Sequence, residues 1–370
     1  MLVSESAIIS WLEPLIAFDT RNGSGDEVAC VEWLAKQLKT FKPDELRVAS
    51  VGRSRGKSDS AYVLASWGTP HILLNVHIDT VPSGEGWTSD PHKLRKEGER
   101  YVGLGTSDIK GAAACILAAL EVTTPQNVAI LFSGDEEHGS EVMPVAIQDN
   151  NLADIAHAIV CEPTYCTMGA RHRGMLAMSV SFDGPGGHSS LSDITEAPLQ
   201  KAARFAAAIS DYGDSFKAIG EAAYKGICLN IGELTSDGAY NVIPTTAQLK
   251  FSMRPPPGDN VLRHLKACED RLHTLYPTAN LDVIAALNPF KSRAPEKLSD
   301  ICLGLPPVDL PYWTEAAMLS EAGVNAVVFG PGHVDQAHKP NEYVEAEQLL
   351  MAAKVYSLAL SGALSGRHDV

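Results

Sequence analysis

The first half of this 370-residue chain alternates between short apolar segments and stretches with the periodicity of helices. The apolar segments contain few polar residues, which is typical of parallel strands that are buried on both faces of a sheet. Helices between such strands cover the two faces, so we predict an α/β domain with a mostly parallel sheet. The expected strands are 61–67, 71–77, 127–132 and 156–161, and the expected helices are 26–40, 110–121 and 141–149.

The pattern changes near residue 175, where apolar and polar residues begin to alternate. The segments that follow have the order β-α-β-β-α-β, which is that of a ferredoxin-like α+β domain. After a linker at 288–295, apolar strands and helices return. We therefore predict one large domain, 1–173 with 287–370, interrupted by an inserted domain, 174–286. The expected elements of the insertion are a strand from 175, helix 197–210, strands 227–233 and 246–253, helix 260–275 and strand 281–286.

The overall composition excludes several classes of partner. A net charge of −15 without a run of Lys or Arg disfavours nucleic acid and anionic membranes. No apolar segment approaches the ~20 residues that span a bilayer, and the N-terminal segment lacks the basic start of a signal peptide. The seven scattered cysteines do not resemble a disulfide framework. We expect a cytosolic protein that acts on a small molecule.

Residues of the kind that bind metals follow the predicted strands. Three consecutive acids, Asp135–Glu137, come directly after strand 127–132. Crowding of this kind raises the pKa of each carboxyl, whereas bound divalent cations would keep them ionised. Carboxyl ends of parallel strands line the ligand crevice of an open α/β sheet, so these side chains should converge there. The others are His77 and Asp79 after strand 71–77, Asp108 before helix 110–121, and Glu162 after strand 156–161.

Each of these residues also has an ordinary structural interpretation. Asp79 and Asp108 could cap a turn or a helix, His77 could be a hydrogen-bonded core histidine, and Glu162 could be a solvated loop acid. Their joint position at strand ends favours a metal site. Other chemistries fit less well: "GLGTSDIKG" (103–111) lacks the complete GxGxxG spacing and Asp108 would repel a phosphate. Neither Ser133 nor Ser189 lies in G-x-S-x-G, and acidic surroundings would raise the pKa of the Cys161 thiol.

Six motifs together resemble the co-catalytic metallopeptidase family of acetylornithine deacetylase, succinyl-diaminopimelate desuccinylase, aminoacylase and bacterial glutamate carboxypeptidases. They occur in the family's order and cover nearly the whole chain. The motifs are "HIDTVP" (77–82), "GLGTSDIKGAAA" (103–114), "SGDEEHGS" (133–140), "EPT" (162–164), "GPGGHSS" (184–190) and "QAHKPNEYV" (336–344).

The resemblance implies a zinc-exopeptidase-like catalytic domain with two divalent metal ions. Ligands without thiolates suit Zn²⁺, with Co²⁺ or Mn²⁺ as alternatives. Glu136 is implied as the general base that activates water, and Asp79 as the residue that orients His77. The implied ligands are His77 and Glu162 for one metal, Glu137 and His338 for the other, and Asp108 as a bridge.

The resemblance also implies residues that contact substrate. His188 of the inserted domain would stabilise the oxyanion in the active site of a partner subunit, which implies a homodimer formed through this domain. Arg254 and Asn241 match positions that hold the substrate's α-carboxylate. The segment "YWTEAAMLSEAG" (312–323) is most similar to the arginine-pathway deacetylases, which cleave N-acetylornithine or, in some bacteria, N-acetylcitrulline. Glu315 is a candidate partner for the ammonium group of ornithine, although a Glu that opens a helix commonly stabilises the helix dipole.

We therefore expect a deacetylase that acts on N²-acetylornithine. N-acetylcitrulline, and a broader aminoacylase or dipeptidase activity of the same family, remain alternatives. A relative that had lost catalysis would be expected to lack a ligand or the general base, and here all of these residues are present.

Overall fold

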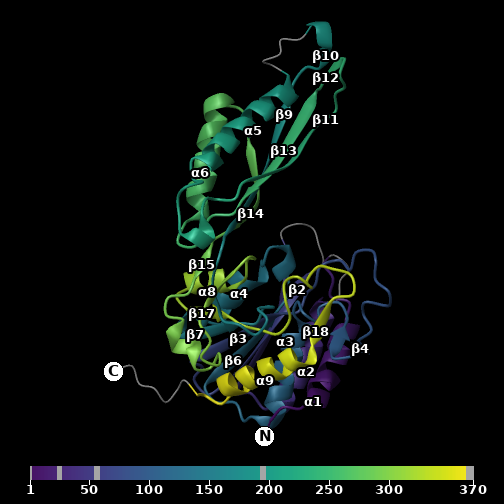
Figure 1. Ribbon diagram of the computed structural model, residues 1–370, viewed down its shortest axis with the longest axis vertical. Coiled ribbons are helices and arrows are strands. Elements are labelled where there is room, and N and C mark those ends of the chain that lie inside the picture. The colour runs from purple at the N-terminus through teal and green to yellow at the C-terminus, as the bar shows by residue number, and fades with distance from the viewer. Residues whose placement is uncertain (1, 23–26, 54–58, 192–196, 364–370) are drawn as a thin grey trace. The chain divides into compact units, whose positions relative to one another are not determined.

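A computed structural model describes residues 2–22, 27–53, 59–191 and 197–363. The chain forms two compact units, of which unit 2 is inserted within the sequence of unit 1 (Figure 1). The short segment Asp309–Trp313, assigned from the sequence to the large domain, belongs to unit 2. Unit 1 consists of Met1–Ala170, Ser292–Val308 and Thr314–Val370, and unit 2 of Arg171–Lys291 and Asp309–Trp313.

A nine-stranded sheet has its central strands in unit 1. Its order is β1 (Glu45–Val51), β2 (Ser60–Trp67), β6 (Val128–Ser133), β3 (Ile72–His77), β7 (His157–Val160), β17 (Asn325–Val328), β8 (Gly169–His172) and β15 (Phe290–Lys291), and β16 (Val308–Leu310) pairs with β8. The four strands β6, β3, β7 and β17 run parallel to one another. Strands β1, β2, β8 and β15 pair antiparallel with their neighbours. The predicted mostly parallel sheet is thus confirmed, with antiparallel flanks.

Helices cover the sheet of unit 1. One group shares a single hydrophobic cluster with the strands. This group is α1 (Glu5–Ala17), α2 (Glu27–Thr40), α3 (Lys110–Val122) and α9 (Ala346–Leu360). Within it, α1, α3 and α9 contact one another (Figure 1). Two further helices, α4 (Val142–Asp149) and α8 (Ala316–Glu321), contact each other and the strands β2, β7 and β17. The remaining elements are a small sheet of β4 (Arg95–Glu97), β5 (Arg100–Val102) and β18 (Tyr343–Glu345), and the short helix α7 (Glu296–Ser299).

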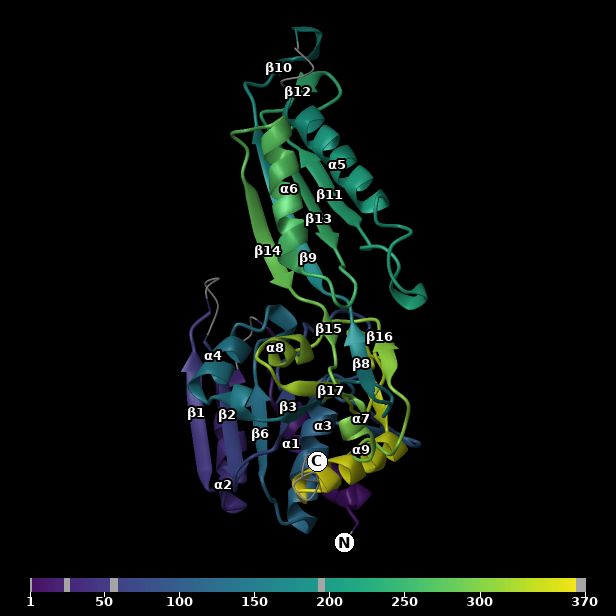
Figure 2. The same cartoon turned by 90° about the vertical axis from the view of Figure 1, so that its left-hand side faces the viewer.

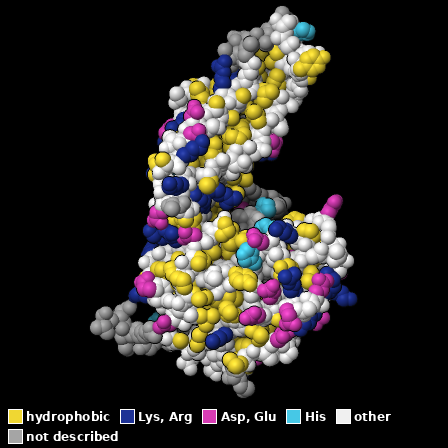
Figure 3. Space-filling view, in the orientation of Figure 1, with side chains coloured by type: hydrophobic (Ala, Val, Ile, Leu, Met, Phe, Trp, Pro, Cys, Tyr) yellow, Lys and Arg dark blue, Asp and Glu magenta, His cyan; other side chains and the backbone are white. Residues whose placement is uncertain are grey.

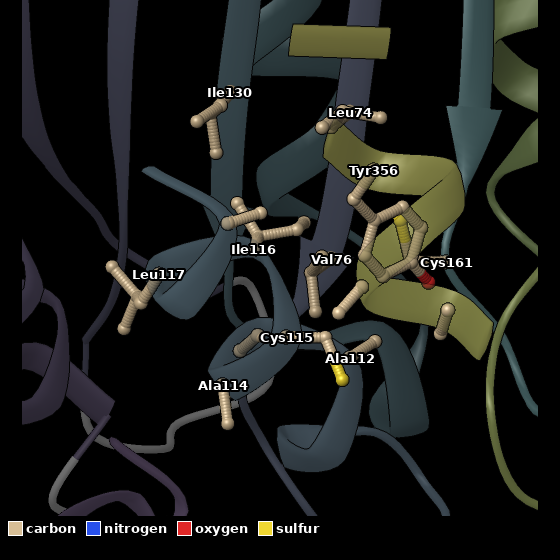
Figure 4. Close-up of a cluster of buried hydrophobic side chains, with 14 of the residues drawn as sticks. Leu74, Val76, Ala112, Ala114, Cys115, Ile116, Leu117, Ile130, Cys161 and Tyr356 are labelled. Carbon is tan, nitrogen blue, oxygen red and sulfur yellow. The ribbon is translucent and has the colours of Figure 1, made fainter. Parts of the chain in front are cut away.

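Helix α3 lies in the centre of the hydrophobic cluster of unit 1. Eleven of its residues are buried, and alanine is frequent among them. Alanine has the highest helix propensity and its small side chain lets neighbouring elements approach closely. Ile116 and Leu117 are fully buried, and Ile116 lies close to Val76 of β3 and Ile130 of β6 (Figure 4). Because α3 begins at Lys110, with only Ile109 between it and Asp108, this packing fixes the start of the helix beside the candidate site.

Unit 2 contains a four-stranded antiparallel sheet in the order β11 (Asn230–Ser236), β13 (Thr246–Met253), β9 (Met175–Asp183) and β14 (Leu281–Leu287). Helices α5 (Pro198–Asp214) and α6 (Val261–Leu275) pack on one face of this sheet (Figure 2). The chain order β9-α5-β11-β13-α6-β14 confirms the ferredoxin-like arrangement. A two-stranded pairing of β10 (Gly187–His188) with β12 (Val242–Ile243) extends from it. Hydrophobic side chains follow the length of unit 2 on the face drawn in Figure 3.

Most predicted elements agree with the structure to within a few residues. The helix expected at 26–40 is Glu27–Thr40 as described, and residue 26 lies outside the described residues. The strand expected at 227–233 begins three residues later, at Asn230. Among the described residues, no helix combines the length and the apolar character that crossing a membrane requires.

Candidate metal centre

The four parallel strands of unit 1 bring the candidate ligands to one edge of the sheet. His77 is the last residue of β3, where it is paired with Ser133, the last residue of β6. The acids at 135–137 come after Ser133 and Gly134, Glu162 comes shortly after β7, and His338 lies in the segment between β17 and β18. Because parallel strands end on the same side, residues far apart in sequence lie together here.

The first group of candidate ligands consists of His77, Asp108 and Glu162. Each offers one ligand atom, and these atoms lie within 4.8 Å of one another. The Nε2 atom of His77 is 3.2 Å from Oδ1 of Asp108 and 3.6 Å from Oε1 of Glu162. One imidazole and two carboxylates form a donor set suited to Zn²⁺ or a similar divalent ion.

The second group consists of Asp108, Glu137 and His338, again with ligand atoms within 4.8 Å of one another. The Nε2 atom of His338 is 2.8 Å from Oε1 of Glu137 and 3.4 Å from Oδ2 of Asp108. Asp108 is therefore common to both groups, and its two oxygens face different histidines. This arrangement fits a carboxylate that bridges two cations.

Asp79 connects the acidic loop to β3. Its side chain is fully buried, and its oxygens accept hydrogen bonds from the backbone N–H groups of Glu136 and Glu137. Its Oδ1 atom also lies 3.4 Å from Nδ1 of His77. Asn22 donates a further hydrogen bond of 2.9 Å to Oδ2. Asp79 thus lies beside His77 and accepts hydrogen bonds from the backbone of the loop, a position that is consistent with the predicted role in orienting His77.

Crowding shifts the pKa values of these groups. Burial raises the pKa of Glu137 and that of Glu162 to about 7. Burial and the charge of Glu162 raise the pKa of Glu136 well above its usual range. Hydrogen bonding to Asp108 and Glu137 raises the pKa of His338 to about 10. In the absence of a cation these shifts favour the protonated forms, from which divalent cations would displace the protons.

Glu315 lies beside the candidate ligands but is buried, with 1% of its surface exposed. Its Oε1 accepts a hydrogen bond from Ser140 at 3.1 Å, and its Oε2 accepts one from Ser133 at 3.3 Å. These two serines flank the acidic loop at its beginning and end. Glu315 is therefore buried behind the acidic loop and is not exposed to a substrate ammonium.

The three substrate residues expected from the inserted domain all lie in unit 2. His188 is exposed in β10, and its Nδ1 lies 2.7 Å from Oγ of Ser190. Asn241 precedes β12 and its carbonyl accepts a hydrogen bond from the N–H of Ser189. The guanidinium of Arg254 has no hydrogen-bond or ion-pair partner within the described part of the chain. Its carbonyl, in contrast, accepts a hydrogen bond of 2.9 Å from Arg173.

Several residues that shape the site were not identified from the sequence. Glu342 accepts backbone hydrogen bonds from the loop that carries Asp108. Arg53 forms a buried ion pair with Glu27 and lies 3.3 Å from Oδ1 of Asp135. Only Glu342 had a signal in the sequence, since it lies in the "QAHKPNEYV" motif. The sequence around Asn22 and Arg53 contains no motif that indicates their roles, because their partners are distant in the chain.

Comparison with known proteins agrees with this geometry. Residues 73–361 match the peptidase family M20/M25/M40. The chain belongs to this family. The resemblance inferred from the six motifs is therefore confirmed, and the chain is an enzyme of the M20 metallohydrolase class.

Individual M20 relatives match almost the full length of the chain. The N-acetyl-L-citrulline deacetylase of Xanthomonas campestris pv. campestris is 32% identical over 361 residues, which cover 93% of this chain and 94% of the relative. The acetylornithine deacetylase of Proteus mirabilis is 31% identical over 354 residues, which cover 89% of this chain and 88% of the relative. The dipeptidase Dug1p of Saccharomyces cerevisiae has a similar fold, with a TM-score of 0.75, 100% of both chains covered and 15% identity.

Proposed function

We propose that this enzyme is a metal-dependent deacetylase that releases acetate from an N-acetyl amino acid of arginine biosynthesis. The main support is the shared position of Asp108 between two groups of candidate ligands, with Glu136 beside them. The carboxylate of Glu136 has no hydrogen-bond or ion-pair partner among the described residues, so its oxygens can accept a proton from water. All seven cysteines are free thiols, which supports a reducing compartment such as the cytoplasm.

In the proposed mechanism, each residue of unit 1 has a separate task. His77, Glu162, Glu137 and His338 would hold two divalent cations, bridged by Asp108, and we propose Zn²⁺ first with Co²⁺ as the alternative. The cations would lower the pKa of the attacking water and polarise the amide carbonyl. Glu136 accepts the proton of this water as its oxygen adds to the carbonyl carbon. Glu136 then delivers the proton to the amide nitrogen as the C–N bond breaks, which yields acetate and the free amine.

We further propose that unit 2 supplies contacts to the substrate. An Arg guanidinium can bind a carboxylate through two parallel hydrogen bonds, and the Arg254 side chain has no such partner within the described residues. Asn241 would contact the same α-carboxylate. His188 would donate a hydrogen bond to the oxyanion in the active site of a second subunit.

A homodimer through unit 2 is consistent with its exposed surfaces. Strands β11 and β14 are the edges of the four-stranded sheet, and edge strands can pair with another chain. Large hydrophobic side chains are exposed on these strands and near β12. They are Leu234, Tyr240, Val242, Val283 and Ile284.

We propose N-acetylcitrulline as the preferred substrate, ahead of N-acetylornithine. Ornithine carries an ammonium group, and Glu315, the residue expected to pair with it, already accepts hydrogen bonds from two serines. Citrulline carries a neutral ureido group instead, so it needs no such carboxylate. The citrulline deacetylase of Xanthomonas also matches the chain over a larger share of its length than the acetylornithine deacetylase of Proteus.

The direct test is acetate release from N-acetylcitrulline and N-acetylornithine in parallel assays. Each assay is run on the purified protein, on chelator-treated protein, and on treated protein supplied again with Zn²⁺ or Co²⁺. We expect turnover that is lost with the chelator, restored with metal and faster with N-acetylcitrulline. Faster turnover of N-acetylornithine would reverse the substrate order. Cleavage of neither substrate by the metal-restored protein would replace the arginine assignment with a broader aminoacylase or dipeptidase activity.

A further inference from the structure

Glu342 is a buried acid whose carboxyl oxygens accept hydrogen bonds from backbone amides. Only 2% of its surface is exposed. Its Oε1 accepts hydrogen bonds from the N–H of Ser107 at 2.7 Å and of Asp108 at 2.9 Å, and its Oε2 accepts one from Gly105 at 2.9 Å. No basic side chain forms an ion pair with Glu342 within the described residues. Three backbone N–H groups within residues 105–108 therefore hold the loop against this one side chain.

Further contacts join the same two segments. The N–H of Gly103 donates to the carbonyl of Glu342 at 3.0 Å, and the hydroxyl of Ser107 donates to the carbonyl of Tyr343 at 2.7 Å. Gly105 has a φ of +85°, a conformation that suits glycine and directs its N–H toward the carboxylate. The loop before α3 is therefore shaped around Glu342.

Two candidate metal ligands depend on the segments that Glu342 joins. Asp108 lies at the end of the loop, and its own N–H is one of the three donors. His338 lies four residues before Glu342, and its Nε2 is 3.4 Å from Oδ2 of Asp108. A displacement of the loop would therefore change the separation of these two ligands directly.

We propose that Glu342 is a positioning residue that holds Asp108 where its two carboxylate oxygens face the two histidines of the candidate metal centre. This proposal rests on the metal role proposed above for Asp108 and His338. Glu342 does not act on the substrate itself, since it is buried and both of its oxygens accept hydrogen bonds from the loop. Its effect on the reaction passes through the metal site.

The test is Glu342→Gln, which preserves the size of the side chain but replaces one of its two acceptor oxygens with an NH₂ group. We expect the apparent affinity for the more weakly held Zn²⁺ to fall by about 10- to 100-fold, the usual effect of losing a group that orients a ligand. Equilibrium dialysis of the full chain against Zn²⁺ measures this affinity. Hydrogen exchange of the metal-free protein should also be faster in the peptide that covers residues 103–109.

Two further variants make the result specific. Glu342→Asp keeps both acceptor oxygens with a shorter reach, so it should restore part of the affinity and of the exchange protection. Glu345→Gln is the matched control, because Glu345 lies on the adjacent strand β18 with a partly exposed side chain 3.7 Å from Arg100. It should bind both Zn²⁺ ions as the unmodified protein does. Circular dichroism establishes that each variant is folded.

Folded Glu342→Gln with unchanged Zn²⁺ affinity and unchanged exchange would overturn the proposal. If this variant does not fold, Glu342→Asp decides, and wild-type affinity and exchange in that variant would overturn it equally. These outcomes are separate from the proposed function, because neither readout uses a substrate. Protein that binds two Zn²⁺ ions but releases no acetate would disprove the deacetylase assignment alone, whereas failure to bind either Zn²⁺ or Co²⁺ would overturn both.

Discussion

The carboxylate of Asp79 accepts a hydrogen bond of 3.1 Å from the backbone N–H of Glu136, the residue proposed as general base. The same carboxylate accepts a bond from the N–H of Glu137 and lies beside Nδ1 of His77. One buried side chain thus connects a histidine ligand, a carboxylate ligand and the base. The relative positions of these three groups therefore depend on Asp79.

Replacement of Asp79 should reduce activity without unfolding the protein. In Asp79→Asn, one oxygen becomes an NH₂ group that cannot accept a bond from the loop amides. We expect kcat/KM to fall by about 10- to 100-fold, together with weaker metal binding. Asp154→Asn is the control, because Asp154 is an exposed acid of the same unit. Unchanged kinetics in Asp79→Asn would show that the loop keeps its position without this carboxylate.

Replacement of the general base should separate metal binding from catalysis. Glu136→Gln keeps the size of the side chain, and Glu136 belongs to neither group of candidate ligands. We expect two bound metal ions per chain by elemental analysis, and a kcat reduced by at least about 100-fold because proton transfer is lost. Turnover close to that of the unmodified enzyme would remove Glu136 from the mechanism.

The stability of the metal-free protein should depend on pH. Burial raises the pKa of Glu137, Glu162 and Glu315 from 4.5 to about 7. Between these values the folded chain keeps protons that the unfolded chain has lost, so the free energy of unfolding decreases as the pH rises through this window. Bound divalent cations would compensate the carboxylate charges.

Calorimetry with and without chelator measures this effect. The Tm of the metal-free protein should be lower at about pH 8 than at about pH 5.5, and added Zn²⁺ should raise the Tm more at the higher pH. A metal-free Tm that is equal or higher at the higher pH would contradict the assigned direction of the pKa shifts.

The hydrophobic cluster of unit 1 gives a prediction for stability. Ile116 is fully buried on α3 (Figure 4). Ile116→Ala should lower the free energy of unfolding by about 2–5 kcal/mol, because it removes apolar contacts and leaves a cavity. Ile116→Val, which removes a single methyl group, should cost about 0.5–1.5 kcal/mol. Denaturant titration of both variants tests this, and equal stabilities would show that the surrounding side chains fill the space.

The central strands and the ligand positions could be predicted because their signals are local. The central strands are apolar segments; β3 ends in a candidate ligand, His77, and the ligands Glu137 and Glu162 come shortly after β6 and β7. His338 lies further beyond β17 and was found through its motif. β1 was missed, since most of its residues are partly or fully exposed and its composition does not distinguish it from a loop. The short strands β15 and β16 have too few residues to show a period.

The supporting hydrogen bonds of the site could not be predicted for a different reason. Asn22 contacts Asp79 across 57 residues of sequence, and Glu342 contacts the Asp108 loop across 234. The donors to Glu342 are backbone N–H groups, which every residue except proline possesses. Only the folded structure shows which of them point at a carboxylate. The same limit applies to Glu315, whose partners are two serines distant in the sequence.

The role of His188 can be tested by mixing two inactive variants. His188 is exposed and lies in unit 2, whereas Glu136 lies in unit 1. We expect His188→Ala to reduce kcat while metal content stays unchanged, because it removes a donor to the oxyanion. Loss of one such donor costs about 100- to 1,000-fold.

If His188 acts in the partner's active site, a mixed dimer with Glu136→Gln contains one site with both residues intact. Unfolding and reassembly of an equal mixture should therefore recover a fraction of the activity. Properly dimeric mixtures that recover none would show that His188 acts within its own subunit or not at all.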